Sequence, residues 1–68
     1  PGQQTFDEIR RKYHRDRAFQ AAVDHYVDDF ERLLEEARAN EDGDVPDYLG
    51  SDTGRVYTLL AHASGRLD

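Results

Sequence analysis

A histidine and several carboxylates lie at helical spacing in the middle of the chain, where they could ligate a metal ion. His25 follows Asp24 directly and lies about one helical turn from Asp28 and Asp29. Such side chains on one helix can hold a metal when a second helix supplies further ligands. The other two histidines have no carboxylate at matching helical spacing. We therefore interpret His25 as a surface histidine paired with neighbouring acids, and predict no metal site.

One acidic stretch partly matches a calcium-binding loop. Asn40, Asp42 and Asp44 occupy the first, third and fifth positions of that pattern. A calcium loop then needs glycine at its sixth position for a sharp turn and a bidentate glutamate at its twelfth. Val45 and Ser51 stand at those positions. The sequence therefore predicts an exposed acidic loop that binds no calcium.

The chain contains potential nucleophiles and bases, but not the local sequence motifs that position such residues for catalysis. Ser51 and Ser64 have a histidine near them in sequence, His62, yet neither lies in the glycine-framed turn of a nucleophile elbow. Catalytic carboxylates need a pocket that shifts their pKa values, and a chain of 68 residues rarely builds one. We predict that the protein is not an enzyme and uses no cofactor.

Residues 49–64 resemble the turn and recognition helix of bacterial repressors. In those proteins polar side chains at the start of the second helix meet base edges, and Thr53 and Arg55 would do so here. Against this, the first helix of the pair would be confined between Pro46 and Leu49, and the preceding segment is strongly acidic. DNA binding is therefore the alternative function, and nucleic acid is not the expected partner.

The clearest periodicity in the chain runs through residues 17–39. Apolar side chains recur three and four residues apart, and neither glycine nor proline interrupts them, which predicts a long amphipathic helix. Its apolar stripe, acting as core or as interface, consists of Phe19, Val23, Tyr26, Phe30, Leu33 and Leu34. The opposite face, which we expect to be solvated, carries the carboxylates Asp24, Asp28, Glu31 and Glu35.

A shorter helix is predicted on the N-terminal side, over residues 5–15. Thr5 and Glu8 have the spacing of a capping box, which predicts the start of this helix. Asp16 can cap the long helix that follows, although one continuous bent helix also fits the pattern.

A second short helix is predicted over residues 52–64, after the acidic loop at 40–51, in which residues 46–50 form at most a single helical turn. Ser51 can cap its start, and Gly65 can end it. Its small and apolar side chains favour packing against the long helix, through a face formed by Val56, Leu59, Leu60 and Ala63. The sequence thus predicts an all-α fold of three helices.

The size of the chain makes this unit marginal when it stands alone. A core built from 68 residues buries little apolar surface, and the absence of cysteine removes disulfides and thiolate metal sites as additional supports. Burial against another protein chain is the remaining source of stability. That chain is either a second copy, as in a homodimer, or a different protein.

Charge is distributed unevenly, and this bears on the kind of partner. Residues 5–18 carry a net charge of +2 and residues 19–53 a net charge of −9, within an overall charge of −6. The acidic centre should repel a nucleic-acid duplex and favour a basic protein surface.

These observations predict one helical domain over residues 1–68, cut from a longer bacterial protein. The chain has no methionine, and its first two residues fit a cloning remnant. No apolar run approaches the length of about 20 residues that a membrane helix needs, so we expect no membrane insertion and a cytoplasmic location. The expected function is non-catalytic protein–protein interaction or oligomerisation, as part of a scaffold.

Overall fold

Four helices make up the regular structure of the chain in a computed structural model that describes residues 2–40 and 45–67. They are α1 (Gly2–Arg15), α2 (Arg17–Asn40), α3 (Val45–Gly50) and α4 (Asp52–Ala63), and these described residues contain no strand. The all-α prediction is confirmed, but the count of three helices is wrong. The six-residue helix α3 lies within the segment that was expected to be a loop.

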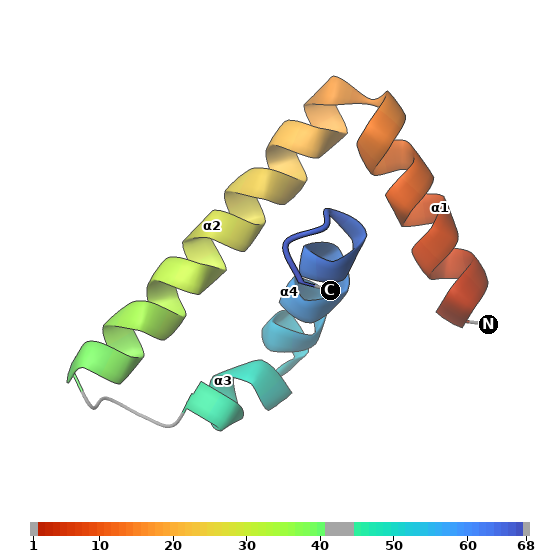
Figure 1. The fold of residues 1–68 in the computed structure, drawn as a ribbon. Helices are drawn as coiled ribbons and strands as arrows, with labels where there is room; N and C mark the ends of the chain where they lie inside the picture. The colour runs from red at the N-terminus through yellow and green to blue at the C-terminus, as the bar shows by residue number, and fades with distance from the viewer. Residues whose placement is uncertain (1, 41–44, 68) are drawn as a thin grey trace.

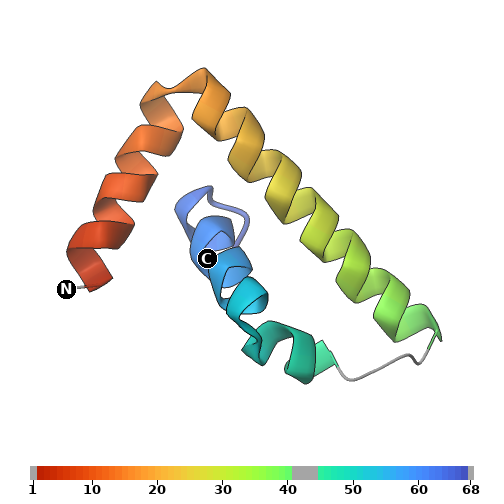
Figure 2. The ribbon, with the colours of Figure 1, turned by 180° about the vertical axis from the view of Figure 1, so that it is seen from behind.

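The helices are arranged as a V with a wedge between its arms. Figure 1 shows α1 and α2 diverging from one corner, with α4 in the angle between them and α3 near the open end. The view from behind shows the same arrangement (Figure 2). Helix α4 contacts α1, α2 and α3, and it therefore links α1 to α3, two described helices that do not contact each other.

The corner between α1 and α2 is fixed by Asp16. Its carboxylate accepts a hydrogen bond from the backbone N–H of Phe19 at 3.0 Å, which caps α2. The side-chain amide of Gln20 donates to the carbonyl of Tyr13 at 3.2 Å across the same corner. The predicted Asp16 cap is confirmed. The capping box at Thr5 is wrong, because α1 begins three residues earlier, at Gly2.

The core lies where α2 and α4 face each other. Val27 is completely buried, and the rings of Phe30 and Tyr57 are stacked with their centroids 4.8 Å apart. Such aromatic pairs add to the free energy gained from burial alone. The remaining buried members of this cluster are Val23 and Ala61. Around it pack half-buried side chains from every helix, including Tyr13, Phe19, Leu34, Tyr48 and Leu60.

Helix α4 buries a different face from the one that was predicted. Val56 is 45% exposed, whereas the buried residues of α4 are Gly54, Tyr57, Ala61 and Ala63. Of the predicted face, only Ala63 is buried. The small residues allow the backbone of α4 to approach its neighbours closely, so the helix is turned to place them inward.

Both ends of α4 follow the sequence prediction. The hydroxyl of Ser51 accepts a hydrogen bond from the N–H of Gly54 at 3.0 Å and caps the start. At the end, Gly65 adopts a positive φ of 83°, and the N–H of Arg66 donates to the carbonyl of Ala61 at 2.8 Å. This geometry is that of a Schellman motif, which favours glycine. It turns Arg66 and Leu67 back toward the bundle.

At Gly54, the start of α4 lies directly against the backbone of α3. A β-carbon placed there would overlap the carbonyl oxygens of Tyr48 and Leu49. We expect Gly54→Ala to lower the free energy of unfolding by about 1–3 kcal/mol, because backbone atoms have little room to move apart. Gly50→Ala is the matched control, since nothing lies within 4 Å of its added carbon. Urea denaturation of both variants tests this, and equal stabilities would contradict it.

Phe30 and Leu33 separate the buried part of the α2 stripe from its exposed part. Phe30→Ala should lower the free energy of unfolding by about 3–5 kcal/mol, because Phe30 is 6% exposed and stacked on Tyr57. Leu33→Ala should change it by no more than about 0.5–1 kcal/mol, because Leu33 is 41% exposed. Thermal melts followed by circular dichroism measure both. A folded Phe30→Ala variant with an unchanged melting temperature would overturn the core assignment.

Candidate functional site

The predicted stripe of α2 divides into a core portion and an exposed portion. Val23 and Phe30 are buried, and Phe19, Tyr26 and Leu34 are half-buried against the core. Leu33 stands apart as an exposed large apolar side chain. The buried part of the stripe is therefore satisfied within one chain, and Leu33 lies at the edge that remains available.

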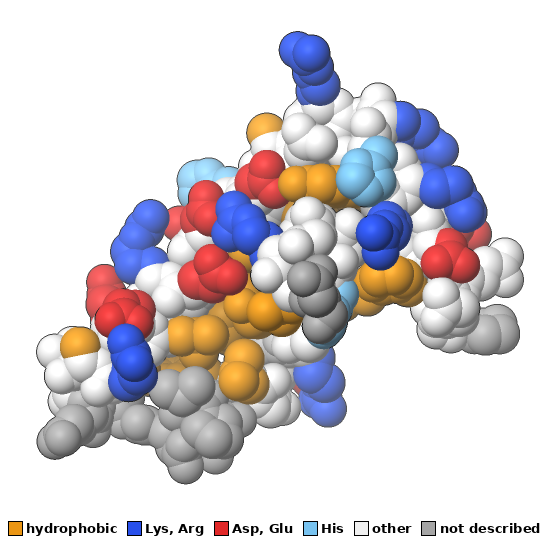
Figure 3. All heavy atoms as spheres, viewed as in Figure 1, with side chains coloured by type: hydrophobic (Ala, Val, Ile, Leu, Met, Phe, Trp, Pro, Cys, Tyr) orange, Lys and Arg blue, Asp and Glu red, His pale blue; other side chains and the backbone are white. Residues whose placement is uncertain are grey.

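Leu33 lies at the junction of two adjoining hollows along α2, which we call together the α2 groove. The first has a volume of about 280 Å³ and lies between α2 and the start of α4; it is lined by Tyr26, Asp29, Phe30, Leu33 and Thr53. The second, of about 130 Å³, continues toward α3 and is lined by Leu33, Glu36, Ala37, Asn40 and Tyr48. In Figure 3, hydrophobic side chains gather over the region between α2 and α4.

Hydrogen bonding and stacking hold the walls of the α2 groove in place. The hydroxyl of Tyr26 donates to the backbone carbonyl of Thr53 at 2.9 Å, which ties α2 to the first turn of α4. Phe30, stacked on Tyr57, lines the groove with its ring. A groove with such fixed walls can receive a side chain with little reorganisation.

Acidic side chains border the α2 groove. Asp29 accepts from the ring of His25 at 2.9 Å and from Arg32 at 3.3 Å. Glu36 forms no ion pair with any residue that the structure describes. The His25–Asp29 contact is the surface pairing predicted from the sequence. The border of the groove thus retains unneutralised negative charge.

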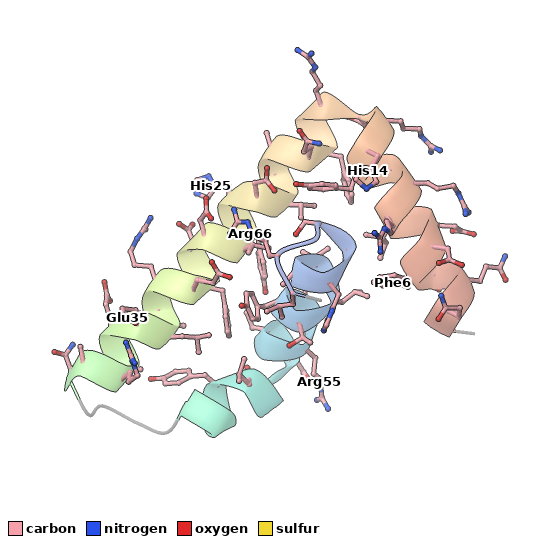
Figure 4. All side chains as sticks on the ribbon, in the orientation of Figure 1. Phe6, His14, His25, Glu35, Arg55 and Arg66 are labelled. Carbon is pink, nitrogen blue, oxygen red and sulfur yellow. The ribbon has the colours of Figure 1, made fainter. Side chains whose placement is uncertain are left out.

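A second polar cluster joins α2 to the other helices on a side that was expected to face solvent only. Arg66 contacts Asp28 at 2.7 Å and Glu31 at 3.2 Å. The hydroxyl of Tyr13, in α1, donates to Asp24 at 2.7 Å, and that of Tyr57 donates to Glu31 at 3.1 Å. In Figure 4, Arg66 lies beside the middle of α2. The prediction that these carboxylates are merely solvated is therefore wrong.

These contacts shift three pKa values upward. The hydrogen bond to Asp24, and then burial, raises the pKa of Tyr13. Burial, and then the hydrogen bond to Glu31, raises the pKa of Tyr57. The hydrogen bond to Asp28 raises the pKa of the Arg66 guanidinium above its ordinary value. Sequence spacing gave no sign of this cluster, because the residues that contact each other in it are up to 38 positions apart in the chain.

The residues proposed for DNA contact lie at the start of α4. Thr53 is exposed, and its carbonyl is the acceptor for Tyr26. Arg55 is exposed as well, points away from the bundle in Figure 4, and pairs with Asp52 at 2.6 Å. This ion pair reduces the charge that Arg55 could offer to a phosphate.

Residues 2–40 and 45–67 contain no group of three metal-ligating side chains. Of the calcium-loop positions, Asp42 and Asp44 lie outside these described residues. The helices that the structure describes are also too short or too polar for any of them to cross a bilayer.

No protein-family model matches the chain, and comparison with curated proteins and with solved structures finds no similar protein.

The raised pKa values of the two tyrosines predict a loss of stability at alkaline pH. Tyr13 and Tyr57 hold their protons more tightly in the folded chain than at the ordinary value of 10.0, so their contribution is fully present below about pH 10. Above it the unfolded chain ionises first, and stability falls. We expect the melting temperature to decline as the pH rises above about 10, and to decline less in the double variant Tyr13→Phe/Tyr57→Phe. If the melting temperatures of the parent and of the double variant decline equally with pH, this assignment is contradicted.

Proposed function

We propose that this chain is a non-catalytic protein-interaction module of a larger protein, and that it docks a partner segment in the α2 groove. The observation that carries the proposal is the exposure of Leu33 at the junction of the two hollows. Apolar side chains elsewhere in the stripe are at least half-buried, so Leu33 is the one stripe residue free to receive a partner's side chain.

The chemistry of the groove suggests what kind of segment it receives. Its walls are the rings of Tyr26 and Phe30 and the side chain of Leu33, which suit an apolar anchor. Asp29 and Glu36 flank Leu33 by about one turn on either side, which suits basic residues beside that anchor. The proposed partner is therefore a basic amphipathic helix of another protein, laid along α2.

DNA binding through α4 remains the alternative prediction, and no observation favours it over a protein partner. The side chain of Arg55 is engaged by Asp52, and the adjoining helix α2 carries six carboxylates against three arginines. Electrostatic attraction supplies most of the affinity in non-specific DNA binding, and it is weak here.

A synthetic peptide tests the groove directly. The probe is a fluorescein-labelled helix with leucines one turn apart and lysines at the flanking positions, titrated with the protein by fluorescence anisotropy. We expect Leu33→Ala to weaken binding about tenfold, because it removes a side chain whose full burial contributes about 1.5–3 kcal/mol. Val56→Ala is the matched control, since Val56 is 45% exposed and lies outside the groove lining. Equal binding by both variants, or none by the parent, would overturn the proposal.

Light scattering over a range of concentrations identifies the occupant of the groove. A monomer that binds the lysine peptide supports a separate partner. A dimer that Leu33→Glu converts to monomer would show that the groove pairs with a second copy, and would overturn the separate partner in favour of homodimerisation.

A further inference from the structure

The eight arginines of the chain fall into two groups that differ in their partners. Arg32, Arg38, Arg55 and Arg66 each form an ion pair with a carboxylate. The other four, Arg10, Arg11, Arg15 and Arg17, form none with any residue in the described ranges, although Asp7, Glu8 and Asp16 are close in sequence. Within the described ranges, the arginines that form no ion pair thus lie in α1 and at the corner that follows it.

Part of this charge borders a hollow with an apolar floor. The hollow has a volume of about 560 Å³, and its lining includes Glu8, Ile9, Arg11, Lys12, Arg15 and Phe19. We call it the α1 basic groove. Ile9 and Phe19 are half-buried, and the three cations are exposed. The ammonium of Lys12 lies 4.9 Å from the centre of the Phe19 ring, so this cation also covers part of the floor.

A neighbouring hollow extends the positive surface around α1. It has a volume of about 500 Å³, and Arg10 and His14 line it together with Arg11 and Arg15, beside the single carboxylate of Asp7. In Figure 3, basic side chains follow the outer edge of α1. Helix α1 has fourteen residues and a length of about 21 Å, enough to lie beside three or four turns of another helix.

We propose that the α1 basic groove docks an acidic amphipathic helix from a second partner protein. An apolar side chain of that helix rests on Ile9 and Phe19, and its carboxylates lie over Arg11, Lys12 and Arg15. This surface is separate from the α2 groove and has the opposite charge preference. The module therefore joins a basic partner on α2 to an acidic partner on α1.

Charge and shape favour an acidic protein helix over a nucleic acid as the occupant. Phosphate groups gain nothing from the apolar floor of Ile9 and Phe19, whereas an apolar anchor does. A duplex long enough to cover α1 would also approach the carboxylates of α2, within a chain of net charge −6. A short acidic helix reaches the cations of α1 without that repulsion.

The experiment uses the whole chain and a fluorescein-labelled peptide helix with leucines one turn apart and glutamates at the flanking positions. Fluorescence anisotropy at about 50 mM salt compares Arg11→Gln/Arg15→Gln with Arg32→Gln/Arg38→Gln. Both pairs remove two exposed positive charges, but only the first borders the α1 basic groove. We expect the first pair to bind about tenfold more weakly and the second to stay within about twofold of the parent. Circular dichroism establishes that both variants are folded.

The outcomes separate this proposal from the one for the α2 groove. Leu33→Ala should leave the affinity for the glutamate peptide unchanged, and replacing the leucines of that peptide by glutamine should abolish binding. Equal losses in the two arginine pairs would mean that only net charge matters, and would overturn the proposal. The parent chain is also titrated with a DNA duplex and with phosphatidylglycerol vesicles. If one of these binds more tightly than the glutamate peptide, and Arg11→Gln/Arg15→Gln abolishes that binding, the occupant of the groove is that anion and the acidic helix is overturned.

Discussion

The contact between Phe30 and Tyr57 is the interaction on which the rest of this structure depends. It stacks a ring of α2 on a ring of α4 at the centre of the buried cluster, beside the completely buried Val27. Helix α1 has no buried residue of its own and is held through its contacts with α2 and α4. Without α4 in the angle, α1 and α2 would be two amphipathic helices joined near the corner, at Asp16 and through the Tyr13–Asp24 hydrogen bond, and neither could bury its apolar face.

At the end of α4, ion pairs and hydrogen bonds to α2 accompany this apolar packing. The turn at Gly65 brings Arg66 against Asp28 and Glu31 of α2. The hydroxyls of Tyr57 and Tyr13 also donate hydrogen bonds to carboxylates of α2. These partly exposed contacts each contribute modestly, but together they fix the rotation of α2 relative to α1 and α4. Arg66, which follows α4, pairs with two carboxylates of α2. Within the described residues, the arginines of α1 form no ion pair with a carboxylate of α2.

Two surfaces of opposite charge result from this arrangement. The α2 groove has aromatic walls and an acidic border around Leu33, and the α1 basic groove has an apolar floor and a cationic border around Ile9. The α1 basic groove takes Phe19 from the start of α2, whereas the α2 groove lies farther along α2, and no lining residue is common to both. In the two proposals, the bundle holds helices of two different proteins close together, as a scaffold would.

The sequence by itself determined the all-α class, three of the four described helices and the caps at Asp16, Ser51 and Gly65, because these depend on periodicity and on hydrogen bonds between residues a few positions apart. Ser51, Asp16 and Gly65 act where local chemistry predicted. Tertiary structure alone decided which face of α4 is buried, because a glycine and two alanines there allow close approach and outweigh the apolar Val56. It alone also decided that α2 carboxylates meet Arg66, and that Leu33 stays exposed within an apolar stripe. These outcomes depend on the distance and rotation between helices, which periodicity along one helix does not encode.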